Sequence, residues 1–269
     1  MNHFLNKNIS VAPLVVFRIL FGALLMYACF WSLFKDDIAN RYFQAQFFFK
    51  YYGFEWISYP GEQGIYALYL CWLLGAAGIL FGAFYRCSIL LFLGSFSYLQ
   101  LIDASNYINH YYALILFSFC LFWLPAQSLC SIDVCRNPKI RAKNTAVIYL
   151  FILRGQVAVI YFFAAVAKFN TDWLLTAMPL KIWLLQLQDF PIIGTIFKYH
   201  SVHLFASWAA FVFDLTIVGL LLFPKTRKIA YIAVVFFHGL TGLLFNIGLF
   251  PLLMITCTTL FFSPSFFDR

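Results

Sequence analysis

Charged residues are scarce in this chain. Of its 269 residues only 10% carry a charge, with 18 Lys and Arg against 10 Asp and Glu. A soluble domain carries about 25% charged residues, and it cannot bury a composition that is 64% hydrophobic. The composition therefore excludes soluble, disordered, fibrous and nucleic-acid-binding proteins, and we expect no nucleic acid partner.

Common catalytic and metal-binding motifs are also missing. The sequence contains no Gly-rich phosphate loop, no HExxH and no GxSxG. Two of the seven cysteines, Cys130 and Cys135, lie in a basic loop, where we expect no disulfide and where a zinc site would lack two ligands. We therefore expect no metal and no redox motif.

Apolar and aromatic residues dominate instead, and 35 of the residues are Phe. About 20 apolar residues in a helix cross roughly 30 Å of hydrocarbon. Such windows recur with short polar interruptions, although two of them, 111–124 and 249–262, are short. We predict one all-α transmembrane domain over 1–269, a helical bundle of about eight spans in a lipid bilayer, with no separate soluble domain. The windows are 11–34, 64–84, 88–108, 111–124, 146–167, 201–223, 229–246 and 249–262.

Basic residues predict the orientation of the spans, because short cytoplasmic loops are enriched in Lys and Arg. We expect a bacterial cytoplasmic membrane protein with a cytoplasmic N-terminus, and two longer extracytoplasmic segments, 35–63 and 168–200. The second should contain an interfacial or re-entrant helix at 180–187. Eight spans place all the basic clusters on the cytoplasmic side: Lys7, Arg86, Arg136, Lys139, Arg141, Lys143, Lys225, Arg227 and Lys228.

Polar residues inside the spans are candidate functional residues, because an ionisable group at membrane depth costs about 2.5 to 3.5 kcal/mol even on the lenient insertion scale. Arg18 and Asp214 are expected to form an ion pair, with Asp103 as the rival partner for Arg18. The full set comprises Arg18, Asp103, Asn109, His110, Arg154, Gln156, Lys168, Asp214, His238 and Asn246.

Spacing places several of these residues on shared helical faces. Asp103, Asn106 and His110 lie at i, i+3 and i+7, which predicts one face of a helix that approaches the extracytoplasmic surface. The alternative is that the Asn residues cap a turn between two spans. His238 and Asn246 are two turns apart and are expected on roughly the same face.

Lys168 closes the fifth predicted span. If that helix is continuous, Arg154, Tyr161 and Lys168 share a face at spacings of seven, with Lys168 near the outer interface. A Lys at a helix end usually extends its amine to the interface as an anchor. A pocket would instead favour the neutral amine, which can act as a base. The residues alone favour the anchor.

The segment YFFAAVAKFNTDW at 161–173, preceded by LRGQ at 153–156, resembles the vitamin K-dependent gamma-carboxylases and the wider horizontally transferred transmembrane domain family. The resemblance covers nearly the whole chain in collinear order. Its other segments are 16–22, 85–86, 101–103, 109–110, 213–215, 237–238, 244–250 and 262–264.

This resemblance implies an extracytoplasmic-side pocket for reduced vitamin K or menaquinol, with oxygen and carbon dioxide as co-substrates. Lys168 matches the lysine that deprotonates the hydroquinone in the carboxylases, so the resemblance favours a base over an anchor. Asn109 and His110 match a pair that holds the oxygenated quinone. His238 matches a pocket histidine, to which we add Tyr161 and Asn246. The pocket would be supported by Arg18, Asp103, Arg154, Gln156 and Asp214.

Two features depart from the carboxylases. They continue into a large extracytoplasmic docking domain, whereas this sequence ends at Arg269, and Ala167 stands where the animal enzymes have a second Lys. Two hypotheses therefore remain. The chain is a quinol-dependent carboxylase of glutamate in a peptide or protein, which a partner subunit could bring, or it is a non-catalytic membrane factor for maturation or export of a secreted peptide.

Overall fold

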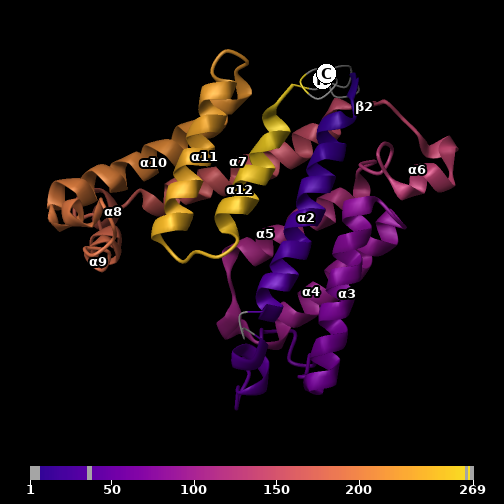
Figure 1. Ribbon diagram of the computed structural model, residues 1–269, viewed down its shortest axis with the longest axis horizontal. Helices are drawn as coiled ribbons and strands as arrows, with labels where there is room; N and C mark the ends of the chain where they lie inside the picture. The colour runs from indigo at the N-terminus through magenta and orange to yellow at the C-terminus, as the bar shows by residue number, and fades with distance from the viewer. Residues whose placement is uncertain (1–6, 35–37, 264–265, 267–269) are drawn as a thin grey trace. The chain divides into compact units, whose positions relative to one another are not determined.

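The computed structural model describes residues 7–34, 38–263 and 266 (Figure 1). The start of the predicted segment 35–63, together with Pro264 and Arg269, lies outside the described residues. The chain divides into two compact units, which are described separately. The first comprises Met1–Leu153 with Ser263–Arg269, and the second comprises Arg154–Phe262.

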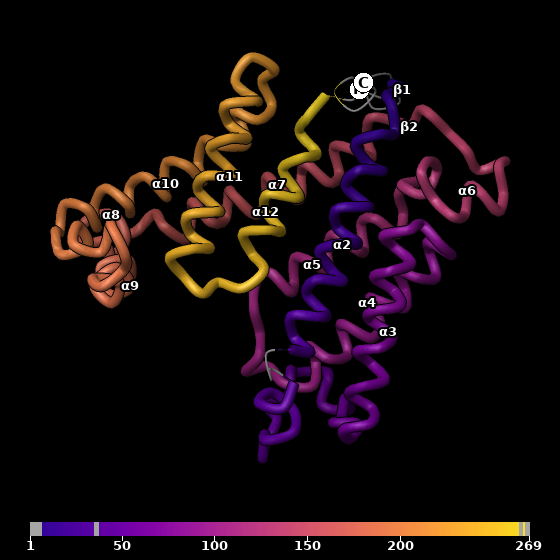
Figure 2. Tube along the Cα trace, viewed as in Figure 1, coloured from indigo at the N-terminus to yellow at the C-terminus, as the bar shows by residue number. Residues whose placement is uncertain are grey.

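The first unit is a helical bundle with one small strand pair. Strand β1 runs antiparallel to β2, with Ile9 opposite Thr145. Helix α2 packs against α3, α3 packs against α4, and α4 packs against α5. Figure 2 follows the chain through this unit. Its elements are β1 (Asn8–Ser10), α2 (Ala12–Phe34), the π-helical turn η1 (Ala39–Phe43), α3 (Gly61–Phe81), α4 (Tyr85–Ile102), η2 (Ala104–Asn106), α5 (Asn109–Trp123), α6 (Ile132–Arg136), η3 (Pro138–Ile140), β2 (Asn144–Ala146) and the start of α7 (Val147–Lys168).

Aromatic side chains fill the interior of this bundle. The rings of Phe17 on α2 and Phe117 on α5 have centroids 5.8 Å apart, and Trp72 on α3 meets Phe96 on α4 edge-on at 4.7 Å. The Trp72 indole also donates a hydrogen bond to the carbonyl of Leu25 at 3.2 Å, which joins α3 to α2. Buried rings thus supply both packing area and a polar contact between helices.

The second unit continues α7 and adds an irregular segment followed by three helices. Helix α10 packs against α11, and α11 packs against α12. Leu180, Leu184 and Phe197 form a small apolar core in the irregular segment, beside the start of α10. The further elements are α8 (Thr171–Leu174), α9 (Leu180–Leu185), η4 (Gly194–Lys198), α10 (His200–Leu222), α11 (Arg227–Leu244), α12 (Phe250–Thr258) and η5 (Thr259–Phe261).

Six described helices are long and apolar enough to cross a membrane: α2, α3, α4, α7, α10 and α11. All eight predicted windows fall on helices. Two of these are short, because α5 has 15 residues and the apolar segment Phe250–Phe261 is also below the length of a full span. The helical membrane fold is confirmed, whereas the count of eight spans remains a prediction.

Two predicted helical faces are wrong. Helix α4 ends at Ile102, and Asp103 has an extended backbone, so Asp103, Asn106 and His110 do not share one helix. Asp103 instead caps the turn η2: its carboxylate accepts bonds from the Ser105 amide at 3.0 Å and the Asn106 side chain at 3.2 Å. Likewise, α11 ends at Leu244, so Asn246 lies beyond the helix that carries His238.

Candidate functional site

Lys168 and Asp214 form an ion pair in the second unit. The Lys168 Nζ lies 2.7 Å from Asp214 Oδ2, and it also donates to the carbonyl of Ala164 at 3.2 Å. The Lys168 side chain is 20% exposed and the Asp214 side chain 7% exposed. The pair therefore joins the C-terminal end of α7 to the middle of α10 in a largely desolvated position.

Tyr161 and His238 form a second polar contact in this unit. The Tyr161 hydroxyl and His238 Nε2 are 2.8 Å apart, and the tautomer of the ring decides which atom donates. Both side chains are buried. The contact joins α7 to α11, so the two polar pairs connect one helix to two neighbours.

An aromatic cage surrounds His238. The ring centroids of Phe213, Phe237 and Phe250 lie 5.9, 5.3 and 5.7 Å from that of the imidazole. Phe213 and Phe237 also stack on each other at 4.0 Å. Within the described part of the chain, the buried Nδ1 of His238 has no hydrogen-bond partner.

Helix α7 presents both polar side chains because it is continuous, as the sequence predicts. Leu153, Val157, Tyr161 and Ala165 are buried at intervals of four residues, which is the spacing of one helical face. Lys168 follows three residues after Ala165. One face of α7 is therefore mostly apolar and carries the Tyr161 hydroxyl and the Lys168 amine towards its C-terminal end. This face packs against the neighbouring helices.

Trp173 helps to hold the end of α7 beside α10. Its indole donates to the carbonyl of Ser207 at 2.9 Å, and the Ser207 hydroxyl donates back to the carbonyl of Trp173. The Lys168 amine lies over the same indole ring, 5.2 Å from its centroid. A second indole, that of Trp208, donates to the carbonyl of Leu174 at 2.9 Å. These bonds restrain the segment that follows Lys168.

The predicted pairing of Arg18 with Asp214 is wrong, because the described partner of Asp214 is Lys168. The rival pairing with Asp103 is wrong as well. The Arg18 guanidinium donates to the carbonyl of Cys130 at 2.6 Å, while Asp103 accepts from the Phe49 amide at 3.1 Å. Arg18 thus binds a backbone carbonyl, while Asp103 accepts hydrogen bonds from nearby backbone and side-chain groups.

Arg154 binds the backbone at the far end of the second unit. Its Nε donates to the carbonyl of Leu260 at 2.8 Å and its Nη2 to that of Phe262 at 3.3 Å. These carbonyls follow α12, where intrahelical donors run out. The pocket-supporting role of Arg154 stays a prediction. Gln156, two residues later, is half-buried.

The remaining predicted site residues are Asn109, His110 and Asn246. Asn109 and His110 begin α5 in the first unit, where Asn109 is exposed and His110 is buried. The His110 ring meets that of Tyr111 edge-on at 4.8 Å. Asn246 is exposed in the turn between α11 and α12. The structure thus unites Tyr161 with His238 and Lys168 with Asp214.

Sequence reasoning missed the aromatic cage and the role of Trp173. Phe213 and Phe237 directly precede the two polar residues Asp214 and His238 in the sequence. In a chain with 35 Phe residues, however, this placement carries little signal. The clustering arises only when α10, α11 and α12 pack together.

The two polar pairs contain groups that can transfer protons. An amine paired with a carboxylate can exchange a proton, and a Tyr–His contact can donate or accept one. Among the described residues, no group of three or more His, Cys, Asp or Glu side chains could hold a metal ion.

Comparison with known proteins assigns the family. No solved structure matches the chain. A family model described as the HTTM domain matches residues 6–266, nearly the whole sequence. This integral membrane protein, whose described residues include six apolar helices of spanning length, therefore belongs to the HTTM domain family.

Proposed function

We propose that the protein is a quinol-dependent enzyme of the vitamin K-dependent carboxylase type. It binds reduced vitamin K or menaquinol in the second unit, consumes oxygen and carbon dioxide, and carboxylates glutamate in a peptide or protein. The observation that carries this proposal is the 2.7 Å contact between Lys168 and Asp214, one helical heptad from the Tyr161–His238 contact on α7.

The aromatic rings around His238 support the binding of a flat apolar ligand in this unit. Aromatic rings favour offset or edge-on contacts with other rings, and Phe213, Phe237 and Phe250 all meet the imidazole at large interplanar angles. The buried Nδ1 of His238 lacks a partner among the described residues. A quinol oxygen could supply the missing hydrogen bond, since buried polar groups are rarely left unpaired.

Lys168 can act as a base only when its amine is neutral. Asp214 Oδ2, 2.7 Å from Nζ, is the group positioned to take up the ammonium proton when the amine becomes neutral. The neutral amine then accepts a proton from a quinol hydroxyl. The hydroquinone, with oxygen, supplies the strong base that the glutamate methylene requires. The apolar surroundings limit the access of water, which would quench such a base.

Quinone epoxide formation tests the proposal directly. Detergent-purified protein receives reduced vitamin K or menaquinol, oxygen and bicarbonate, and the epoxide is measured by chromatography. Lys168→Ala should abolish epoxide. Lys198→Ala is the matched control, because Lys198 is an exposed lysine of the same unit. Equal epoxide formation by Lys168→Ala, or none by the folded native protein with both quinols, would contradict the proposal.

The alternative is a non-catalytic factor for maturation or export of a secreted peptide. The two hydrogen bonds of the Lys168 amine, to Asp214 and to the Ala164 carbonyl, favour a structural role. Replacing both charges with apolar residues, Lys168→Met with Asp214→Leu, separates the two functions. The double variant should remain folded, because apolar pairs often replace buried ion pairs without loss. A catalytic role predicts that it is inactive, whereas the structural role predicts that peptide maturation continues.

A further inference from the structure

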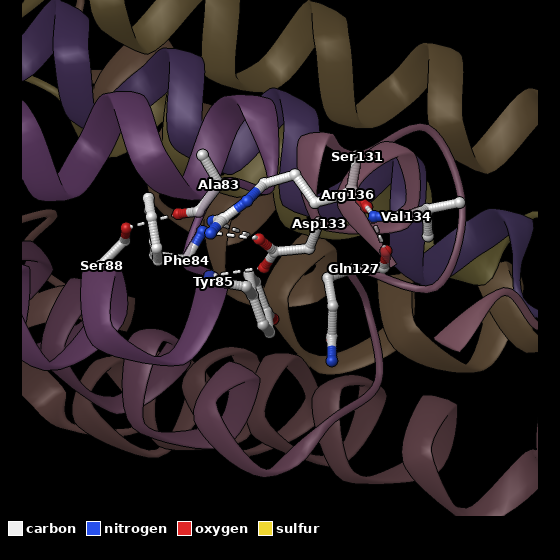
Figure 3. Close-up of polar contacts among 9 residues, drawn as sticks. All are labelled: Ala83, Phe84, Tyr85, Ser88, Gln127, Ser131, Asp133, Val134 and Arg136. Atoms are coloured by element: carbon white, nitrogen blue, oxygen red, sulfur yellow. Dashed lines mark hydrogen bonds and ion pairs between the residues drawn. The ribbon is translucent and has the colours of Figure 1, made fainter. Parts of the chain in front are cut away.

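An open pocket of about 480 Å³ lies on the first unit, where the turn between α3 and α4 meets the α6–η3 segment. Its polar lining residues include Arg86, Gln127, Asp133, Arg136 and Asn137. Figure 3 shows the contacts around it. The pocket belongs entirely to the first unit and shares no residue with the Lys168 site.

The carboxylate of Asp133 is already engaged within the protein. It accepts hydrogen bonds from the amides of Phe84 and Tyr85, both at 2.8 Å, and so caps the start of α4 (Figure 3). Its Oδ1 also lies 3.9 Å from Arg136 Nη1. Among the described residues that line the pocket, Asp133 is the only acidic one.

Positive charge therefore exceeds negative charge at the pocket. The Arg136 guanidinium lies 3.9 Å from the centre of the Phe84 ring, and its side chain is 51% exposed. Such stacking orients a guanidinium and leaves its edge free to donate. Arg86 lies over the Phe122 ring at 5.9 Å. The pocket lining thus contains two arginines, Arg86 and Arg136, and one carboxylate, Asp133, which already accepts two backbone hydrogen bonds.

A third arginine lies buried beside the same turn. Arg18 is fully buried, and among the described contacts its Nε and Nη1 have no acceptor. A Cβ atom built at Gly82 would collide with its Nη1, so the guanidinium lies against the α3–α4 turn. A buried charge without a carboxylate partner adds a positive potential that water screens poorly.

Apolar side chains are exposed around the arginines. Phe84 is 61%, Ile132 is 44% and Ile140 is 36% exposed. The chain continues with the exposed cations Lys139, Arg141 and Lys143. A mixture of exposed apolar and basic side chains is typical of a protein surface that lies at the boundary between lipid headgroups and acyl chains.

We propose that this pocket binds the phosphate headgroup of an anionic phospholipid. Arg86 and Arg136 contact the phosphate, whose oxygens match the planar fork of a guanidinium. Phe84, Ile132 and Ile140 rest at the acyl boundary. Free inorganic phosphate would use the arginines alone and would make no use of these apolar side chains.

Native mass spectrometry of the full-length protein in detergent tests the proposal, with phosphatidylglycerol and phosphatidylcholine as probes. The native protein should retain phosphatidylglycerol preferentially. The double variant Arg86→Ala with Arg136→Ala should bind it at least tenfold more weakly, since each cation near an anionic lipid surface is worth about fivefold in affinity. The matched control, Lys225→Ala with Lys228→Ala, removes two exposed cations of the second unit and should bind as the native protein does.

A second measurement needs no variant. For the native protein, sodium chloride should weaken phosphatidylglycerol binding, because the Debye length falls to about 3 Å at 1 M salt. Equal retention of the two lipids, or unchanged phosphatidylglycerol binding in the Arg86 and Arg136 variant, would overturn the proposal. Sodium phosphate is the competitor in a third measurement. If it displaces phosphatidylglycerol when both are present at equal concentration, the lipid assignment is wrong and the pocket binds free phosphate.

Discussion

Lys168 and Asp214 are 46 residues apart in the sequence, yet their charged atoms lie 2.7 Å apart. The contact links the end of α7 to α10 in a setting where Asp214 is almost fully buried. A charge at that depth must be paired, because removing either partner leaves the other without compensation. This relationship leads to the first prediction.

Asp214→Asn should destabilise the protein by about 3 kcal/mol, near the lower end for broken buried pairs because Lys168 keeps some exposure to solvent. Thermal unfolding in detergent measures the loss. In a double-mutant cycle with Lys168→Met, the two substitutions should cost clearly less together than the sum of their separate effects. Strict additivity would show that the two charges do not interact.

Tyr161→Phe should cost about 1 to 2 kcal/mol, because it removes the hydroxyl and leaves a buried nitrogen of His238 without a partner. Tyr149→Phe serves as a control, since it makes the same chemical change on α7 outside the second unit. Unfolding midpoints under identical detergent conditions provide the comparison. Equal midpoints for the two variants would count against a stabilising Tyr161–His238 contact.

Asp133→Ala should destabilise the first unit by about 1 to 2 kcal/mol, the usual effect of losing a helix cap. The carboxylate satisfies two backbone amides at the start of α4, and both would lose their acceptor. Hydrogen exchange of the Phe84 and Tyr85 amides should speed up. Asp189→Ala, at an exposed acidic residue, should change neither stability nor exchange at these amides.

Gly82→Ala should be more harmful than Gly53→Ala. Both glycines have positive φ, 61° and 81°, so both substitutions strain the backbone by about 1 kcal/mol or more. Only at Gly82 would the new methyl group also collide with its neighbours, the Arg18 guanidinium and the Ser131 Cβ, whereas the space at Gly53 is open. Thermal unfolding of the two variants separates backbone strain from the collision. Equal losses would show that Arg18 and Ser131 both move aside freely.

Hydrophobic patterning predicted the helices well, because a span needs only length and composition. Each apolar window overlaps a helix, and the proline-bounded window 180–187 contains α9 (Leu180–Leu185). The helix ends were less predictable. The spacing predicted Asp103 on a helical face, but its carboxylate accepts hydrogen bonds from nearby amides and the helix ends before it. Such side-chain bonds compete with the helix for backbone amides, and residue spacing does not reveal this.

The sequence alone could not predict which residues of different helices contact each other. Opposite charge predicted an ion pair between Arg18 and Asp214. In the structure Asp214 pairs with Lys168, and Arg18 donates to a backbone carbonyl. Periodicity places a residue on a face of its own helix, but it does not say which helix that face meets. Tyr161 and His238, 77 residues apart, illustrate the same limit.

The heptad spacing of Tyr161 and Lys168 also sets the rotation of α7 about its own axis. Residues seven apart differ by only about 20° around a helix, yet Tyr161 meets α11 and Lys168 meets α10. Inserting one residue between them would turn one side chain away by about 100° while the other stays in place. The stretch 161–168 should therefore tolerate substitutions at its exposed positions but no change in length.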